Sequence, residues 1–266
     1  MKVVSFLTAL LLSSPNSQAS PQASAPTSTS STQAATLLAK SAAALTGNVA
    51  LSDVSLTGTV RRIAGSDNES GTAVLKALSS GAGRLDLGLP SGQRSELSNV
   101  SAAPAGSWSG PDGISHAMAY HNLLTEPAWF FPAFAVARRL SGTGFVAAYV
   151  GHETNNGQAV EHVSVLQSSP LPTPAGGVSF EHLTQVDFFL DSTTLLPAAI
   201  SFNIHPDNNA LLDLPVEVHF SDYRVVNGAQ VPYQIQKFLN NTLLLDFQVQ
   251  TVTFNSGLTD SSFSIQ

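Results

Sequence analysis

The sequence predicts a mainly β (α+β) fold, in which a single strongly curved antiparallel sheet forms an incomplete barrel around an N-terminal helix and a mid-chain helical insertion. Three observations support this fold class. Apolar and polar residues alternate over many short segments, which is typical of strands with one buried and one solvated face. Turn-forming clusters separate these segments at short intervals. Two segments show a helical pattern, and a long sheet must curl around such segments to bury its apolar face.

The N-terminal residues predict export followed by a polar tether. Lys2 gives a positive start, and residues 3–12 form an apolar run of the length found in signal peptides. Small residues ending at Ala19 and at Ala25 both fit a cleavage site, and because the first lies at the more usual distance from the apolar run, residues 1–19 are interpreted as a signal peptide. A buried helix or an uncleaved anchor is the alternative, although a bilayer span needs roughly 20 apolar residues. Residues 20–32 are a low-complexity polar stretch and are predicted to be disordered.

Residues 33–266 are predicted to form one domain. It opens with an Ala- and Leu-rich helix over residues 33–48, which Gly47 and Asn48 end. About ten strands then follow in a meander, with tight hairpin turns at Asn156-Gly157 and Asn227-Gly228. Residues 92–115 are loop-rich and receive no element. The alternation is clearest in the segments DVSLTGTVR, RLDLGL, AAISFNI, VEVHF, VPYQIQK and LDFQVQ.

The meander is interrupted over residues 116–140, where the period of two is lost. The second part of the interruption, EPAWFFPAFAVARRL, is called the aromatic segment and covers residues 126–140. Proline is favoured in the first turn of a helix, so either Pro127 or Pro132 can begin one; from Pro132 the helix would run to Leu140, and Gly142 would end it. Arg138 and Arg139 would then complement the dipole at its C-terminal end.

The composition excludes several classes of protein. A formal net charge of −7 and the lack of a basic stripe argue against a nucleic-acid partner. The chain has no cysteine, which excludes disulfides, thiol nucleophiles, zinc–thiolate sites and a lipid-modified N-terminal cysteine. Neither a nucleophile elbow nor a phosphate-binding loop is present. We therefore expect no catalytic residues, no cofactor and no enzymatic activity.

The histidines do not show the spacing of a metal site. His116 and His121 are five residues apart, which on a helix would point them about 140° apart. Other histidines lie next to a glutamate, and neighbours in a strand face opposite sides of the sheet. We therefore expect surface histidines and no bound metal. The histidines next to a glutamate are His152, His162 and His182.

The C-terminal third carries a series of turn motifs in a fixed order. LDSTTLLPAAISFNIHPDN begins at Leu190, Asp-Tyr-Arg-x-x-x-Gly-x-x-x-Pro begins at Asp222, and Asn-x-Gly-Leu-x-Asp-x-x-Phe begins at Asn255. This order resembles the LolA-like lipoprotein-carrier superfamily, periplasmic proteins with an unclosed antiparallel barrel around helices. The resemblance covers most of the mature chain. It implies a periplasmic or secreted protein that binds a lipid-like ligand or a lipoprotein on its concave face.

The aromatic segment leaves two interpretations open. Three consecutive aromatic residues cannot all face one way, so one side needs an apolar partner beyond the sheet. The segment is then either core alone or core that also forms the wall of an acyl-binding cavity. The candidates for that cavity are Trp129, Phe130, Phe131, Phe134, Phe202, Tyr233 and Phe247.

Three functions remain under consideration for the predicted fold. The first is an exported soluble carrier, without a transmembrane segment in its mature chain, that holds a lipid or lipoprotein acyl chain. The second is an interaction or sensor module for another envelope protein, with an interior filled by its own side chains. The third and least favoured is a hydrolase that uses paired carboxylates, which must face each other across a cleft.

Overall fold

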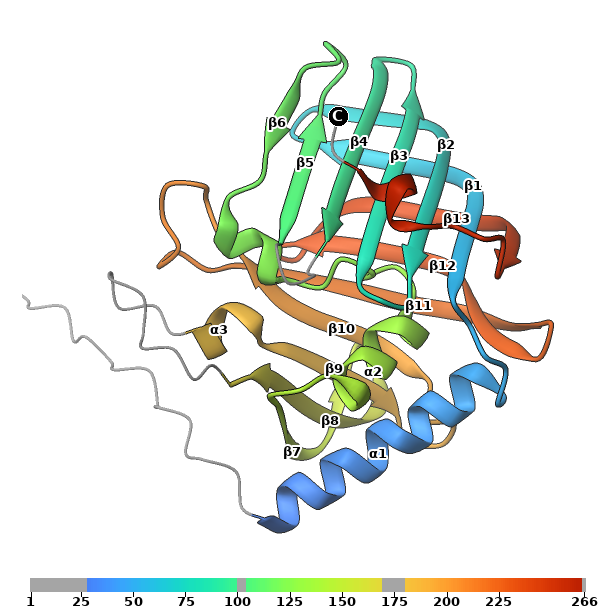
Figure 1. Ribbon diagram of the computed structural model, residues 1–266, viewed down its shortest axis with the longest axis vertical. Helices are drawn as coiled ribbons and strands as arrows, with labels where there is room; N and C mark the ends of the chain where they lie inside the picture. Colours follow the sequence, from blue (N-terminus) through green and yellow to red (C-terminus); the bar gives the residue numbers. More distant parts are fainter. Residues whose placement is uncertain (1–27, 100–103, 169–179, 265–266) are drawn as a thin grey trace, which may run out of the picture.

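The computed structural model describes residues 28–99, 104–168 and 180–264. The predicted signal peptide, residues 1–19, lies outside these ranges. Most of the described chain belongs to one antiparallel sheet (Figure 1). Its strands are β1 (Asp53–Ala64), β2 (Asp67–Leu78), β3 (Ala82–Leu89), β4 (Gly92–Asn99), β5 (Ala105–Ser109), β6 (Ser115–Ala117), β7 (Phe145–Asn155), β8 (Gln158–Gln167), β9 (Val186–Asp191), β10 (Pro197–Ile204), β11 (Leu214–Val226), β12 (Ala229–Leu239) and β13 (Thr242–Phe254).

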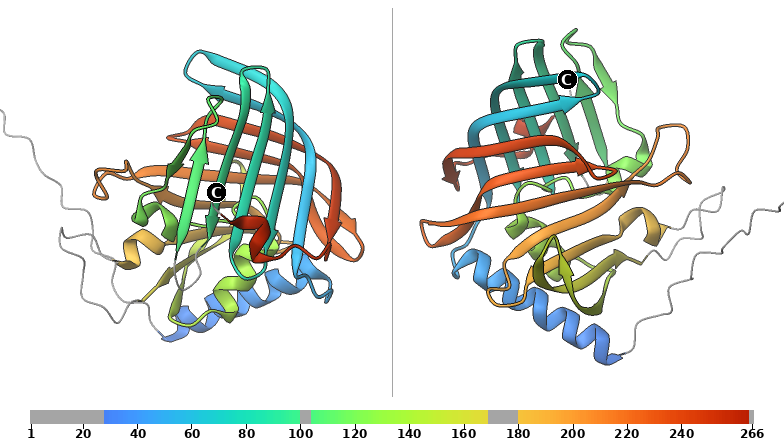
Figure 2. Two further views of the ribbon diagram at one scale, coloured as in Figure 1. Left: turned by 45° about the horizontal axis from the view of Figure 1, so that its top comes forward. Right: turned by 180° about the vertical axis from the view of Figure 1, so that it is seen from behind.

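The strand order shows why the sheet is an incomplete barrel. The order is β6-β5-β4-β3-β2-β1-β13-β12-β11-β10-β9-β8-β7, so neighbours in the chain are neighbours in the sheet. The exception is the pairing of β1 with β13, which joins the first and last strands in the middle of the sheet. The two edge strands, β6 and β7, do not pair with each other. The predicted fold class is therefore confirmed, and Figure 2 shows the curvature from two further sides.

The longer helices lie at one end of the curved sheet. The helices are α1 (Ser28–Thr46), α2 (Pro132–Ser141) and α3 (Phe180–Thr184), with short 3-10 helices η1 (Tyr120–Leu124) and η2 (Asp260–Phe263). Helix α1 packs against α2 and against strands β7, β8 and β12, and it crosses the lower end of the molecule in Figure 1. None of the helices in the described ranges is long and apolar enough to span a membrane.

Several predicted boundaries agree with the structure and two differ. Helix α2 begins at Pro132, the second of the two expected starts, and is capped as expected by Gly142, whose N–H donates to the carbonyl of Arg138. The Asn-Gly hairpins have positive φ at both residues, which confirms them as tight turns. Helix α1 starts at Ser28, so residues 28–32 of the predicted tether are helical, because Ser and Thr are readily accepted at the start of a helix.

The other difference concerns the number of strands. There are thirteen strands among the described residues instead of about ten, because the loop-rich residues 92–115 contain β4, β5 and the start of β6. The sequence of β4, GQRSELSN, has a single aliphatic residue and therefore shows no alternation.

Two histidines differ from the prediction. His182 was expected in a strand but lies in the short helix α3. His205 is buried, unlike the surface histidines that the sequence suggested.

The hydrophobic core lies between the concave face of the sheet and the aromatic segment. Inward residues of most strands join one continuous apolar cluster with Phe130 and Phe131, which are 1% and 0% exposed. Strand β3 approaches the segment so closely that a Cβ atom at Gly83 would overlap the backbone carbonyl of Pro127. The aromatic segment is therefore pressed directly against the sheet.

Candidate functional site: a cationic cavity on the concave face

The seven residues predicted to line a ligand cavity all belong to the core or pack against it. Six are buried, and Tyr233 is half-buried. The aromatic rings contact one another: the centroid of Phe131 is 4.8 Å from that of Phe134 and 6.0 Å from that of Phe254. The buried six are Trp129, Phe130, Phe131, Phe134, Phe202 and Phe247.

A buried ion pair joins the two ends of the aromatic segment. Glu126, whose side chain is 1% exposed, accepts hydrogen bonds from Nη1 of Arg139 and from the backbone N–H of Ala128. Nη1 of Arg138 is 3.9 Å from the same carboxylate. Burial tends to raise the pKa of Glu126, but the charges of Arg139 and Arg138 outweigh it and hold that pKa below its usual value. Arg138 and Arg139 were predicted only to complement the helix dipole, and the structure shows that they also interact with the carboxylate of Glu126.

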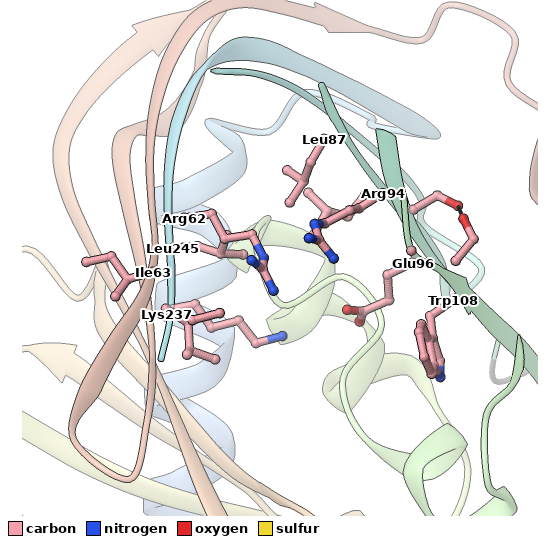
Figure 3. A pocket seen from close by; sticks show the side chains of 14 residues that line it. Arg62, Ile63, Leu87, Arg94, Glu96, Trp108, Lys237 and Leu245 are labelled. Carbon is pink, nitrogen blue, oxygen red and sulfur yellow. Dashed lines mark hydrogen bonds between the residues drawn. The ribbon is translucent and has the colours of Figure 1, made fainter. Parts of the chain in front are cut away.

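A separate cavity of about 320 Å³ lies beside the aromatic segment, between two walls of the sheet. One wall consists of β1, β12 and β13, and the other consists of β3, β4 and β5. In Figure 3, Arg62 and Lys237 of the first wall point toward Arg94 and Glu96 of the second. The apolar part of the lining consists of Ile63, Ala64, Leu85, Leu87, Trp108, Leu244 and Leu245.

Strand register places three cations in this lining. Arg62 of β1 and Lys237 of β12 both lie opposite Leu245 of β13, so the three side chains form one row across adjacent strands. On the other wall, Arg94 of β4 lies opposite Leu87 of β3. Antiparallel neighbours at such positions project to the same face of the sheet. We call the space lined by Arg62, Arg94 and Lys237 the cationic cavity.

The cations of the cationic cavity are not neutralised by ion pairs. Among the described residues, no carboxylate lies within 4.0 Å of the charged nitrogens of Arg62, Arg94 or Lys237. Nη1 of Arg62 and Nε of Arg94 are buried and have no hydrogen-bond partner within the described ranges. Nζ of Lys237 lies 4.4 Å above the ring of Trp129. Unsatisfied buried donors carry a free-energy cost that a bound anion would remove.

Two further side chains complete the site. Glu96 lies opposite Leu85 on one side and opposite Trp108 on the other, so it belongs to the same row across β3, β4 and β5. It is the single carboxylate among the cavity-lining residues, against three cations. Trp108 is 42% exposed and stacks on His116, with ring centroids 4.3 Å apart, so its indole is accessible from the cavity. The cavity therefore combines a net positive charge with an accessible apolar wall.

Sequence reasoning missed the cationic cavity, although part of a signal was present. Arg62 follows Val60 by two residues in β1, and Lys237 follows Ile235 by two residues in β12. Each cation thus continues the inward side of an alternating strand, where an apolar residue is expected. Arg94 gave no such signal, because β4 does not alternate.

Comparison with known proteins identifies the fold. No family model matches the chain. No curated protein matches it either. Among solved structures, a domain named as an outer membrane lipoprotein-sorting protein from Vibrio parahaemolyticus superposes with a TM-score of 0.55 at 11% identity, covering 88% of this chain and 97% of the other.

Two further solved structures give similar values. A LolA superfamily protein from Nitrosomonas europaea has a TM-score of 0.53 at 9% identity and covers 87% of this chain and 97% of its own. A DUF1329 family protein from Desulfovibrio piger has a TM-score of 0.53 at 10% identity and covers 88% and 97%. These likenesses extend over nearly the whole of each neighbour, and the chain therefore has a LolA-like fold.

Proposed function

We propose that the protein is an exported binding or carrier protein that holds an acyl chain of an anionic lipid or lipoprotein in the cationic cavity. The observation that carries this proposal is the combination of a leucine-rich wall with three cations that lack carboxylate partners among the described residues. An amphiphile with an anionic group would satisfy both features. The proposed location is the periplasm, supported by the predicted signal peptide.

The apolar wall accounts for the chain of the guest. Ligand cavities typically have volumes of roughly 300–1,000 Å³, so about 320 Å³ suits a single short apolar segment. Each methylene removed from water contributes about 0.8 kcal/mol to binding. Leu85, Leu87 and Leu245 provide the surface against which such a chain would pack.

The cations account for the polar end of the guest. Arginine forms charge-assisted, often bidentate hydrogen bonds with carboxylate and phosphate oxygens. Arg62 and Arg94 project from opposite walls of the cavity (Figure 3), so an anion between them can be bound from two sides. Lys237 adds a third positive charge next to Trp129.

A second function, an interaction module for another envelope protein, is favoured by the aromatic segment. Its rings are packed against one another and against the sheet, so this part of the interior is filled by the protein itself. Under this alternative the cationic cavity would bind an acidic side chain of a partner instead of a lipid. The two functions differ in whether a lipid remains bound to the purified protein.

Lipid extraction and native mass spectrometry of the purified protein test the proposal. We expect a co-purifying anionic lipid, and we expect brominated fatty acid to quench the fluorescence of Trp108 in the Trp129→Phe variant. Absence of both, in a folded protein, would refute the carrier function.

A matched pair of variants tests the role of the cations. Arg62→Gln should weaken fatty-acid binding at least ~10-fold, because a hydrogen bond to a charged group contributes about 1.5–3 kcal/mol. Arg61→Gln is the control, since Arg61 lies one residue away on the other face of β1 and donates to Asn68. Equal affinity of the two variants would count against an anionic subsite.

A further inference from the structure

Three side chains from separate segments meet beside the loop between β10 and β11. His182 lies on α3, His205 directly follows β10, and Asp213 directly precedes β11. Nε2 of His182 is 2.8 Å from Oδ1 of Asp213, and Nε2 of His205 is 3.1 Å from the same oxygen. One ligand atom from each residue lies within 4.8 Å of the other two. We propose that these residues form a binding site for a divalent transition-metal ion, with Zn²⁺ the best match.

The donor set and its spacing match zinc. Bonds of about 2.0–2.2 Å to imidazole nitrogen and carboxylate oxygen, arranged as a tetrahedron, place the donors about 3.3 Å apart. The two histidine–aspartate distances, 2.8 and 3.1 Å, are close to that spacing. The third distance can shorten by rotation of His182, whose side chain is 38% exposed. Imidazole with carboxylate suits zinc, and the chain has no cysteine to provide a thiolate.

His205 is held in position by η1. Its side chain is fully buried, its backbone N–H donates to Oδ1 of Asn122 at 2.9 Å, and its carbonyl accepts from Nδ2 of Asn122 at 2.7 Å. The ring of His121 lies edge-on to that of His205, with centroids 5.7 Å apart. Nε2 of His121 is 3.1 Å from the carbonyl of Pro206. These contacts fix the backbone of His205, while Nδ1 of its ring has no hydrogen-bond partner among the described residues; a ligand held on a fixed backbone favours metal binding.

The site also has an open side. The side chains of His182 and Asp213 are 38% and 43% exposed, so an ion can enter and keep water as a further ligand. Without an ion, both imidazoles donate to the same oxygen of Asp213. With an ion, each neutral ring would carry its proton on Nδ1, so that the lone pair of Nε2 is free to bind the metal, and an imidazolium would release its second proton to solvent.

A bound ion would connect α3 to the loop between β10 and β11. Helix η1 follows the edge strand β6 and contacts α3, which precedes β9 near the opposite edge. Because the ligands come from α3 and from the β10–β11 loop, and because η1 positions His205, the ion would fix these segments together. An ion that binds only the folded state stabilises it by mass action. The inferred role is therefore structural, and it is independent of the acyl chain.

Metal binding can be measured on protein without an affinity tag, after EDTA treatment and dialysis. We expect one zinc ion per chain by elemental analysis, a rise in melting temperature on adding zinc, and the visible absorption bands of tetrahedral Co²⁺. Asp213→Asn and His182→Gln should each weaken zinc by more than the roughly 10–100-fold that loss of an outer partner costs. The cobalt bands should disappear in both variants.

Two other variants make the test specific. His219→Gln is the matched control, because Nε2 of His219 is 2.7 Å from Oε1 of Glu217, its ring packs against Phe238, and among the described residues it belongs to no cluster of three metal-ligating side chains. It should bind zinc as the unaltered protein does. Asn122→Ala removes a positioning contact and should weaken zinc about 10–100-fold. Circular dichroism without metal checks that each variant is folded. Absence of stoichiometric zinc, or equal affinity in Asp213→Asn and His219→Gln, would overturn the proposal.

Discussion

The aromatic segment and the cationic cavity lie next to each other on the concave face, and they differ in how their charges are satisfied. In the aromatic segment, Glu126 and Arg139 are both about 1% exposed and bind each other. In the cationic cavity, Arg62 and Arg94 have no carboxylate within 4.0 Å among the described residues, and this lack of an ion pair is what distinguishes them, because both regions contain buried arginine nitrogens without a hydrogen-bond partner. Arginine thus occurs in two different settings within one interior.

The presence or absence of an ion-pair partner separates arginines that we expect to stabilise the fold from arginines that we expect to bind an anionic ligand. A buried charge with a partner contributes to a defined packing, whereas its loss leaves the other charge uncompensated. A cation without an ion-pair partner makes no such contribution to the packing. Substitutions in the aromatic segment should therefore lower stability, and substitutions of the cavity cations should change ligand binding.

The largest loss of stability is expected for Glu126→Gln. Removing one partner of a buried ion pair costs about 3–5 kcal/mol, because the remaining charge stays buried. Urea unfolding followed by circular dichroism measures this change. Asp222→Asn is the control, since Asp222 forms an exposed ion pair with Arg224 and should give no measurable change. Similar losses in both variants would show that the burial of Glu126 has no special role.

The same pair makes stability depend on pH. The pKa of Glu126 is lowered in the folded protein, so the unfolded chain binds its proton more readily. The contribution is complete above the ordinary value of 4.5 and is lost as the pH falls through the lowered folded-state pKa. We therefore expect the stability difference between the unaltered protein and Glu126→Gln to shrink in acid. A difference that is constant between pH 7 and pH 3 would contradict this assignment.

An intermediate loss is expected where the sheet touches the aromatic segment. In Gly83→Ala the added methyl group would overlap the backbone carbonyl of Pro127, and overpacking of this kind costs about 1–3 kcal/mol. Gly151→Ala in β7 is the control, because nothing lies within 4 Å of its new Cβ atom. Thermal unfolding of the two variants compares them. If Gly83→Ala were as stable as Gly151→Ala, the segment would be free to move away from β3.

The smallest effect on stability is expected for Arg62→Gln. Its guanidinium has no ion-pair partner among the described residues, so its loss should change the free energy of unfolding by no more than about 0.5 kcal/mol. The same variant should lose fatty-acid affinity, as proposed above. A stability loss above about 1 kcal/mol would mean that Arg62 supports the fold, which would remove the contrast with Glu126.

The fold could be predicted from the sequence wherever strands face water on one side. β10, β12 and β13 alternate clearly, and Asn227-Gly228 marks a turn by its backbone requirement alone. The polar strand β4 could not be found in this way, because its neighbours in space determine its pairing. α3 was missed because a helix of five residues has too few turns to show a period.

The site was harder to predict than the fold. The alternation that locates strands also predicts that charged residues lie on the solvent-exposed face of the sheet. It therefore did not identify Arg62 and Lys237 as residues of the concave face. The histidine cluster combines residues from positions 182, 205 and 213, and only the folded chain brings them together. The seven predicted aromatic positions remain candidates for contact with a guest, and the structure places them in or against the core.

The ion pair that joins the ends of the aromatic segment has a consequence for the length of a guest. With Glu126 bound to Arg139, the two ends of the segment are held together, and its Trp129 lies beneath Lys237, a residue that lines the cavity. We expect the segment to limit how deep a bound chain can reach past Lys237. Each additional methylene of a guest chain should strengthen binding by about 0.8 kcal/mol until the chain reaches that depth. Longer chains would extend into water without further gain, so the segment would act as a molecular ruler.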